Sequence, residues 1–190
     1  KNSPYRDRSI EENLDLFEKV INKTIPKVDY VDIRGGNGNN TSIIMKDGEV
    51  QEINTGNSLG IRIRVLNNGA WGFAYTNDLS KLDEIAQTSI KISNSLKGDE
   101  SLSKADIIQD KVSTDVKIPF SDVSIEEKKE IMSEASKAAS LKEVTSTTVS
   151  YSDSQSQEVI LSSEGTSIEM NTNRVAMFLN AAASDGTMMQ

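Results

Sequence analysis

The stretch Leu59-Gly60-Ile61-Arg62-Ile63-Arg64-Val65-Leu66-Asn67-Asn68-Gly69-Ala70-Trp71-Gly72-Phe73-Ala74-Tyr75 decides the fold class of this chain. Its first part alternates apolar and charged or small residues, which is typical of a strand with one buried face and one charged face. The pair Asn68-Gly69 readily takes the positive φ angles of a two-residue hairpin turn. The stretch therefore predicts two antiparallel strands of a sheet that is covered on one side.

The aromatic residues Trp71, Phe73 and Tyr75 lie on one face of the second strand. Such a row can stack on bases or line a peptide groove. Because Gly72 and Ala74 alternate with them, we interpret the three instead as core residues that pack against helices. We expect Trp71, the single tryptophan, to be buried and the two arginines of the first strand to lie on the opposite face.

Working outward, the segment Ser9-Ile10-Glu11-Glu12 has the form of a capping box and predicts a helix that Pro26 ends. The turn pair Asp47-Gly48 predicts another hairpin, and a second helix is expected over 80–96. The predicted apolar stripes of the two helices are Ile10, Leu14, Phe17 and Ile21, then Leu82, Ala86 and Ile90. The predicted strands are Val28–Ile33, Thr41–Met45, Glu49–Ile53, Leu59–Val65 and Trp71–Tyr75.

The same pattern restarts after a charged, serine-rich connector. Ser124-Ile125-Glu126-Glu127 repeats the first capping box, and turn candidates return at Glu164-Gly165 and Asp185-Gly186. These features predict an internal duplication of a helix-plus-meander unit, with half-repeats at about 9–96 and 124–190 and a connector at about 97–123. The fold class is α+β, an antiparallel or mixed sheet with helices packed on it. The stripe expected for the second-half helix is Ile131, Ala135 and Ala138, and the strands expected after it are Val144–Tyr151, Val159–Leu161, Thr166–Met170 and Val175–Ala183.

The composition excludes several functional classes. The chain of 190 residues contains no histidine and no cysteine, so it cannot by itself build a typical zinc site, a cysteine nucleophile or a serine–histidine site. Its formal charge of −8 disfavours nucleic acid and anionic membranes as partners. No apolar run is long enough to span a membrane and no signal peptide precedes the first helix, so we expect a cytoplasmic protein.

Two local motifs invite a site but do not support one. The cluster Gly35-Gly36-Asn37-Gly38 is followed by a predicted strand rather than a helix, so we interpret it as a flexible inter-strand loop and not as a phosphate loop. Asp29 and Asp32 are expected on opposite faces, and the acidic group Asp47, Glu49 and Glu52 surrounds a turn, where acidic residues are ordinarily solvated. We therefore predict no catalytic, cofactor-binding or metal-binding residue in this chain.

The segments Gly60-Ile61-Arg62-Ile63-Arg64-Val65 and Gly69-Ala70-Trp71-Gly72-Phe73-Ala74-Tyr75-Thr76-Asn77-Asp78-Leu79-Ser80 resemble the amino-terminal domain of the TldD/PmbA family. Further matches lie in Tyr30–Arg34, Lys46–Val50, Ser163-Glu164-Gly165 and Asp185-Gly186. Members of the family were once called modulators of DNA gyrase and are regarded as zinc metallopeptidases. The resemblance implies that zinc binds a carboxy-terminal domain absent from this chain, on a His-Glu-x-x-x-His helix and a later cysteine.

The resemblance also implies a homo- or heterodimer with another family member, enclosing a cleft that cuts unstructured peptides. We accordingly expect a non-catalytic amino-terminal domain that shapes the substrate cleft and the dimer interface. The alternative is a stand-alone module that binds extended peptide by adding it as a strand to an exposed sheet edge. The first residue is not methionine and the last predicted strand stops early, so we expect a piece of a longer protein.

Overall fold

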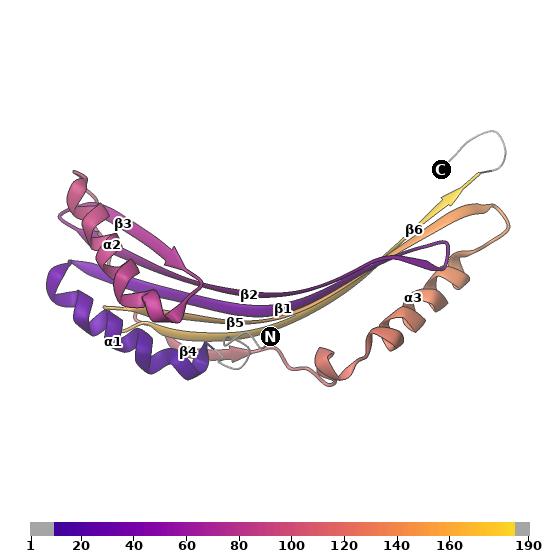
Figure 1. The fold of residues 1–190 in the computed structure, drawn as a ribbon, viewed down its shortest axis with the longest axis horizontal. Coiled ribbons are helices and arrows are strands. Elements are labelled where there is room, and N and C mark those ends of the chain that lie inside the picture. Colours follow the sequence, from indigo (N-terminus) through magenta and orange to yellow (C-terminus); the bar gives the residue numbers. More distant parts are fainter. Residues whose placement is uncertain (1–9, 185–190) are drawn as a thin grey trace. The chain divides into compact units, whose positions relative to one another are not determined.

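The computed structural model describes residues 10–184 and forms an α+β fold with a mixed six-stranded sheet (Figure 1). Its helices are α1 (Leu14–Thr24), α2 (Leu82–Ser95) and α3 (Ile125–Ala139), with short 3-10 turns at Glu11–Asn13, Ile25–Lys27, Leu79–Lys81 and Phe120–Asp122. Its strands are β1 (Tyr30–Lys46), β2 (Glu49–Asn67), β3 (Ala70–Thr76), β4 (Gln109–Ser113), β5 (Val144–Ser162) and β6 (Ser167–Ala183).

The strand order β3-β2-β1-β5-β6-β4 places the first strand of each predicted half-repeat next to the other at the middle of the sheet. The turns between β1 and β2 and between β2 and β3 have positive φ angles at both central residues: Asp47 at 52° and Gly48 at 81°, then Asn68 at 49° and Gly69 at 72°. This geometry confirms both predicted hairpin turns.

The strands are longer than predicted, and the glycine cluster is not a loop. β1 runs without a break through Gly35-Gly36-Asn37-Gly38, and β2 joins two of the predicted strands. β1 lies between β2 and β5, so its backbone groups pair on both sides and this pairing outweighs the weak strand propensity of glycine and asparagine. A Cβ on Gly35 would lie 2.9 Å from Ile10 Cδ1 and 3.0 Å from Phe17. The absence of a side chain at Gly35 therefore allows the first helix to pack closely on β1.

The chain divides into two compact units, and each has its own core. Unit 1 comprises residues 1–38, 58–113 and 156–171, and unit 2 comprises 39–57, 114–155 and 172–190. In unit 1, α1 and α2 pack against the odd-numbered residues of β1 and β2 (Figure 1). The predicted stripes are confirmed there, because Phe17, Ile21, Leu82, Ala86 and Ile90 are all buried.

In unit 2, α3 buries a different face from the predicted one. Ile131 is 49% exposed and Ala138 is exposed, whereas Lys128, Met132 and Ser136 are buried. The actual core of this unit is Ile43, Met45, Met132, Val149 and Tyr151. The prediction was wrong because it followed apolar residues only, and the face that turns inward contains a lysine and a serine that find polar partners in the interior.

Lys128 pairs inside unit 2 with Asp153 of β5. The Lys128 Nζ lies 2.7 Å from Asp153 Oδ2, and both side chains are less than a tenth exposed. The Tyr151 hydroxyl donates to the same carboxylate oxygen over 2.7 Å. Burial, followed by this contact with Asp153, raises the pKa of Tyr151. The network fixes α3 on β5, since breaking a buried pair leaves an uncompensated charge.

The second predicted capping box is present. Ser124 Oγ accepts the Glu127 backbone N–H over 3.2 Å, and the Glu127 carboxylate accepts the Ser124 N–H over 2.7 Å. The contact with the Ser124 backbone is the main cause that lowers the pKa of Glu127. Ser9 of the first box and the turn Asp185-Gly186 lie outside the described residues. Both halves show a helix followed by a hairpin, and the duplication itself stays a prediction.

The predicted connector contains one strand that sequence patterns did not indicate. β4 is exposed along its whole length and pairs in parallel with the start of β6, from Gln109 opposite Ser167 to Ser113 opposite Asn171. No helix within residues 10–184 is long and apolar enough to cross a membrane.

Candidate functional site

The most distinctive surface of unit 1 is the side of its sheet that α1 and α2 do not cover, here called the helix-free face. It displays the even-numbered residues of β1 and β2 and the odd-numbered residues of β3, because α1 and α2 pack on the opposite side. The register places Arg62 opposite Tyr75 and Arg64 opposite Phe73. Residues directly opposite in an antiparallel pair share a face, so arginines and aromatic residues lie side by side.

This arrangement corrects the interpretation of the aromatic row. Phe73 is 47% exposed, Tyr75 is 76% exposed and Trp71 is half-buried, so the three are not core partners of the helices. The inner face of β3 carries small residues instead, because α2 approaches closely. A Cβ on Gly72 would lie 1.8 Å from the Ser89 carbonyl oxygen. In the sequence, the small residues on the inner face of β3 and on the facing side of α2 were the signal. They indicate that this side of β3, and not the aromatic side, packs against the helix.

A compact polar and aromatic cluster fixes part of the helix-free face. The Nε of Arg64 donates to Asp32 Oδ2 over 2.8 Å, the Nη2 of Arg64 lies 2.8 Å from the same oxygen, and Asp32 is almost completely buried. The Arg64 guanidinium lies 4.4 Å from the centre of the Trp71 ring, and Tyr30 meets that ring edge to face. Burial, and next the charge of Asp32, raise the pKa of Tyr30. Arg64 is thus held as a structural cation.

Next to this cluster lies a pocket of about 400 Å³. Its charged lining residues are Arg34, Arg62 and Glu158, and its hydroxyl groups come from Ser58 and Ser156. Gly36 and Gly60 belong to the same face and have no side chains to fill the space. A Cβ on Gly60 would meet nothing within 4 Å. The pocket is therefore a hollow over two strand glycines with charged side chains around it.

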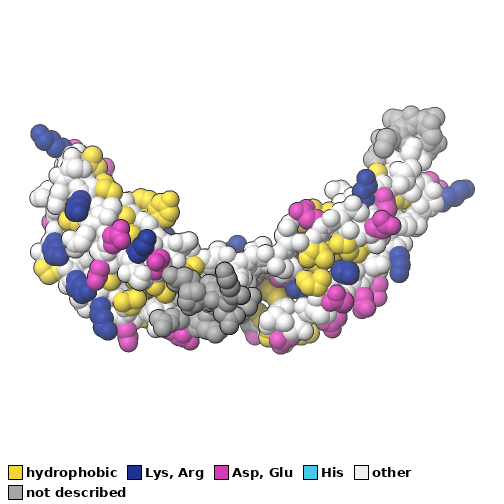
Figure 2. Space-filling view, in the orientation of Figure 1, with side chains coloured by type: hydrophobic (Ala, Val, Ile, Leu, Met, Phe, Trp, Pro, Cys, Tyr) yellow, Lys and Arg dark blue, Asp and Glu magenta, His cyan; other side chains and the backbone are white. Residues whose placement is uncertain are grey.

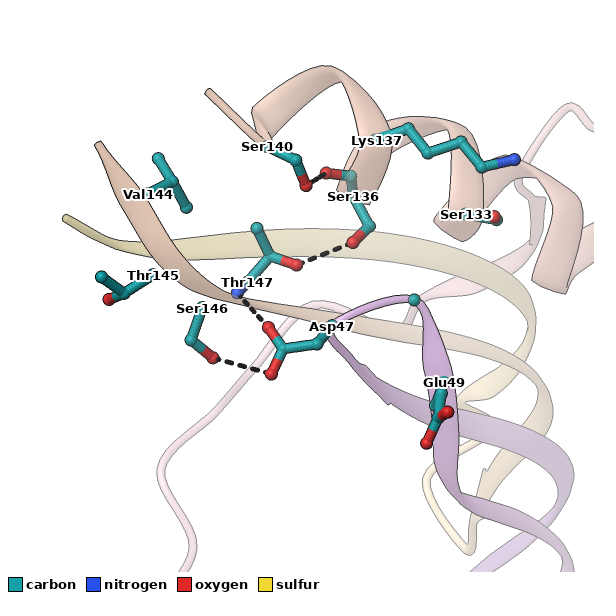
Figure 3. A pocket seen from close by; sticks show the side chains of 11 residues that line it. Asp47, Glu49, Ser133, Ser136, Lys137, Ser140, Val144, Thr145, Ser146 and Thr147 are labelled. Atoms are coloured by element: carbon teal, nitrogen blue, oxygen red, sulfur yellow. Dashed lines mark hydrogen bonds between the residues drawn. The ribbon is translucent and has the colours of Figure 1, made fainter. Parts of the chain in front are cut away.

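Unit 2 has a hydroxyl-rich pocket of about 400 Å³ at the turn between β1 and β2 (Figure 3). Asp47 accepts the Thr147 backbone N–H over 2.7 Å and the Ser146 hydroxyl over 3.2 Å. These contacts, the backbone one first, lower the pKa of Asp47. The acidic turn residue therefore attaches the hairpin to β5 and is not simply solvated as predicted.

Ser136, Ser140 and Thr147 in this pocket also have hydrogen-bond partners. Ser136 and Thr147 share a hydrogen bond of 2.7 Å, and Ser140 donates to the Ser136 carbonyl oxygen over 2.8 Å. Figure 3 shows the Lys137 side chain extending away from the Asp47 carboxylate. These hydrogen bonds attach α3 and the hairpin to β5.

The carboxylates considered as metal ligands are engaged separately. Asp29 accepts the Asn68 backbone N–H over 2.8 Å, whereas Asp32 is paired with Arg64. Within residues 10–184, no three Asp or Glu side chains gather where they could hold a metal ion. Acidic and basic side chains lie interspersed on the visible surface of each unit (Figure 2).

Two family models match the chain. The model of PmbA/TldA metallopeptidase domain 1 matches residues 31–93, and that of the PmbA/TldA metallopeptidase central domain matches 118–190. A metalloprotease of Methanothermobacter thermautotrophicus is 45% identical over 181 residues, which cover 95% of this chain and 40% of the relative. A metalloprotease of Methanocaldococcus jannaschii is 35% identical, with 94% of this chain and 40% of the relative covered.

Solved structures share the fold at low sequence identity. A protein designated as a modulator of DNA gyrase from Bacteroides thetaiotaomicron aligns with a TM-score of 0.77 at 17% identity, over 95% of this chain and 43% of that one. TldE from Thermococcus kodakarensis aligns with a TM-score of 0.69 at 17% identity, over 90% of this chain and 40% of that one. This chain thus spans about 40% of the curated relatives it matches. The matched domains and relatives together place the chain in the TldD/PmbA family, as its amino-terminal part.

Proposed function

We propose that this chain is the non-catalytic amino-terminal part of a zinc metallopeptidase that cuts unstructured peptides. In this role it shapes the substrate cleft and contributes to the interface of a homo- or heterodimer with another family member. The observation that carries the proposal is chemical: relatives named metalloproteases extend well beyond this segment, and the segment has neither histidine nor cysteine.

The residues present do not fit a peptidase zinc. Such a site takes about three protein ligands, mostly histidine nitrogen or cysteine sulfur together with a carboxylate, and leaves one position open for water. Asp29, Asp32 and Asp47 already accept hydrogen bonds from different partners. The metal is therefore assigned to the part of the parent protein outside this chain, and no catalytic step is assigned to the residues described above.

The test compares the full-length protein that carries this sequence with the 190-residue chain. Both are incubated with an unfolded peptide and zinc, with and without a chelator. We expect chelator-sensitive cleavage by the full-length protein and none by the chain. Chelator-sensitive cleavage by the chain alone would refute the assignment.

A second candidate is a stand-alone peptide-binding module that works by strand addition. It is favoured by β3, which stands at one edge of the sheet and displays the exposed Phe73 and Tyr75. A sheet edge offers unpaired backbone groups to an extended peptide. A full-length protein that binds peptide but never cleaves it would favour this candidate. Cytoplasmic location stays a prediction for both.

A further inference from the structure

Two arginines in the pocket of the helix-free face have no partner in the described part of the chain. Arg34 and Arg62 both line the pocket, and no hydrogen bond or ion pair joins either to another residue within 10–184. Arg34 is exposed, whereas the Nε of Arg62 is buried with no acceptor in the described part of the chain. A buried donor costs free energy unless a protein group, an ordered water or a ligand accepts from it, so an acceptor bound at this N–H would be stabilised.

The neighbouring Arg64 is paired, so the lack of partners at Arg34 and Arg62 is not a general property of the arginines on this face. Arg64, one pleat further along β2, is fully engaged with Asp32 and the Trp71 ring. Glu158 reaches over Gly36, where a Cβ would lie 3.6 Å from its Cγ, and it also lacks a partner in the described part. Two free cations against one free anion leave a local positive excess on a chain of formal charge −8.

We propose that this pocket binds the carboxylate of an acidic side chain in an extended peptide, with Arg62 and Arg34 as the donors. A guanidinium presents its N–H groups in a planar fork that matches a carboxylate, and charge-assisted bonds of this kind are the strong ones. Glu158 repels a second anion and accepts N–H groups of the peptide backbone. The bare strand glycines Gly36 and Gly60 let the peptide approach the sheet.

The same face supplies a place for the neighbouring peptide residue. Tyr75 stands directly opposite Arg62 and stacks on Phe73 with 6.2 Å between ring centroids. An apolar or aromatic residue beside the acidic one would pack on this exposed pair. The inference rests on the proposed function, since it names a preference for acidic residues within the unstructured peptides that the parent protein cuts.

The experiment uses the full-length protein and two fluorescent unstructured peptides that differ only in one central Glu or Gln. Fluorescence anisotropy at low salt measures binding of both, and cleavage is followed separately. We expect the Glu peptide to bind about tenfold more tightly, and Arg62→Gln or Arg34→Gln to remove this difference while the Gln peptide binds as before. Lys91 is an exposed cation on α2, which packs on the opposite side of the sheet. Lys91→Gln should therefore leave the affinity difference between the two peptides intact.

Gly60→Glu gives an independent readout in case an arginine variant misfolds. The position has open space around its Cβ, so the new carboxylate can occupy the pocket and should also abolish the Glu preference. Equal binding of both peptides to the unaltered protein, or an unchanged preference in all three pocket variants, would overturn the inference. Equal binding with cleavage of both peptides would refute the carboxylate site but keep the proposed function, whereas absence of any cleavage would refute the proposed function.

Discussion

At the scale of single residues, the pair Asp32–Arg64 is the clearest energetic feature of the helix-free face. We expect Asp32→Asn to lower the free energy of unfolding by about 1–3 kcal/mol, because a charged hydrogen bond is lost while Arg64 stays partly hydrated. The measurement is urea denaturation. Asp83→Asn is the control, since Asp83 and Lys23 form an ion pair in which both side chains are 63% exposed. Such a pair should contribute less than about 1 kcal/mol, so equal effects of the two variants would contradict the prediction.

Asp47 predicts a pH dependence of stability. Its pKa in the folded chain is lowered from the ordinary value of an aspartate, chiefly by the hydrogen bond from the Thr147 backbone N–H. Because the pKa of Asp47 is lower in the folded chain than in the unfolded chain, its carboxylate stabilises the folded chain fully at pH values above the unfolded pKa. This stabilisation is lost as the pH falls through the folded pKa. Stability should therefore decline below about pH 4.

Asp47→Asn tests this contribution with little change to the turn, because Asn-Gly also favours positive φ. In thermal denaturation between pH 2 and 5 the variant should show a shallower acid slope than the unaltered chain. Glu49→Gln removes the same charge from the same hairpin and should keep the slope. The same slope in all three proteins would rule out Asp47 as a contributor.

At the scale of elements, the close approach of α2 to β3 depends on Gly72. We expect Gly72→Ala to destabilise the chain by about 3 kcal/mol, because its Cβ would collide with the backbone carbonyl of Ser89, which cannot move without shifting the helix. Gly60→Ala is the matched control on the helix-free face and should stay within about 0.5 kcal/mol, as its Cβ meets nothing. Denaturant midpoints would measure both, and a mild effect at Gly72 would contradict the packing.

The buried face of α3 can be tested with two neighbouring residues. Met132→Ala should cost about 2–5 kcal/mol, since Met132 is fully buried in the core of unit 2. Ile131→Ala should change stability by no more than about 0.5 kcal/mol, because Ile131 is 49% exposed. A larger loss of stability for Ile131→Ala than for Met132→Ala would support the buried face that apolar spacing alone predicted.

The helices and the strand β3 also show which features sequence patterns could predict and which they could not. Turn pairs and apolar spacing in α1 and α2 located both hairpins and both helix faces, because those signals are local. The aromatic row and α3 were misjudged because their orientation depends on tertiary partners. In α3, Lys128 is buried only because Asp153 lies on a distant strand. The arginine pocket was missed because the neighbours of Arg62 across the sheet come from β1 and β5.

At the scale of the whole molecule, the two units differ in the size of their cores. Among the described residues, fifteen buried hydrophobic residues form the main cluster of unit 1 and five form that of unit 2. Fewer buried apolar contacts lower the free energy of local opening. We therefore expect backbone amides of α3 to exchange hydrogen faster than those of α2, as measured by hydrogen–deuterium exchange with mass spectrometry on the full-length protein.

Met132→Ala makes this expectation specific, because the residue belongs to the core of unit 2 alone. The variant should accelerate exchange in α3 and in the β5 residues Val149 and Tyr151 that pack with it, while peptides from α2 keep their protection. If the two units instead open only together, exchange will rise equally in both, and the division into separately stable cores will be wrong. Leu82→Ala provides the converse control, since its loss should expose α2 and leave α3 at its original rate.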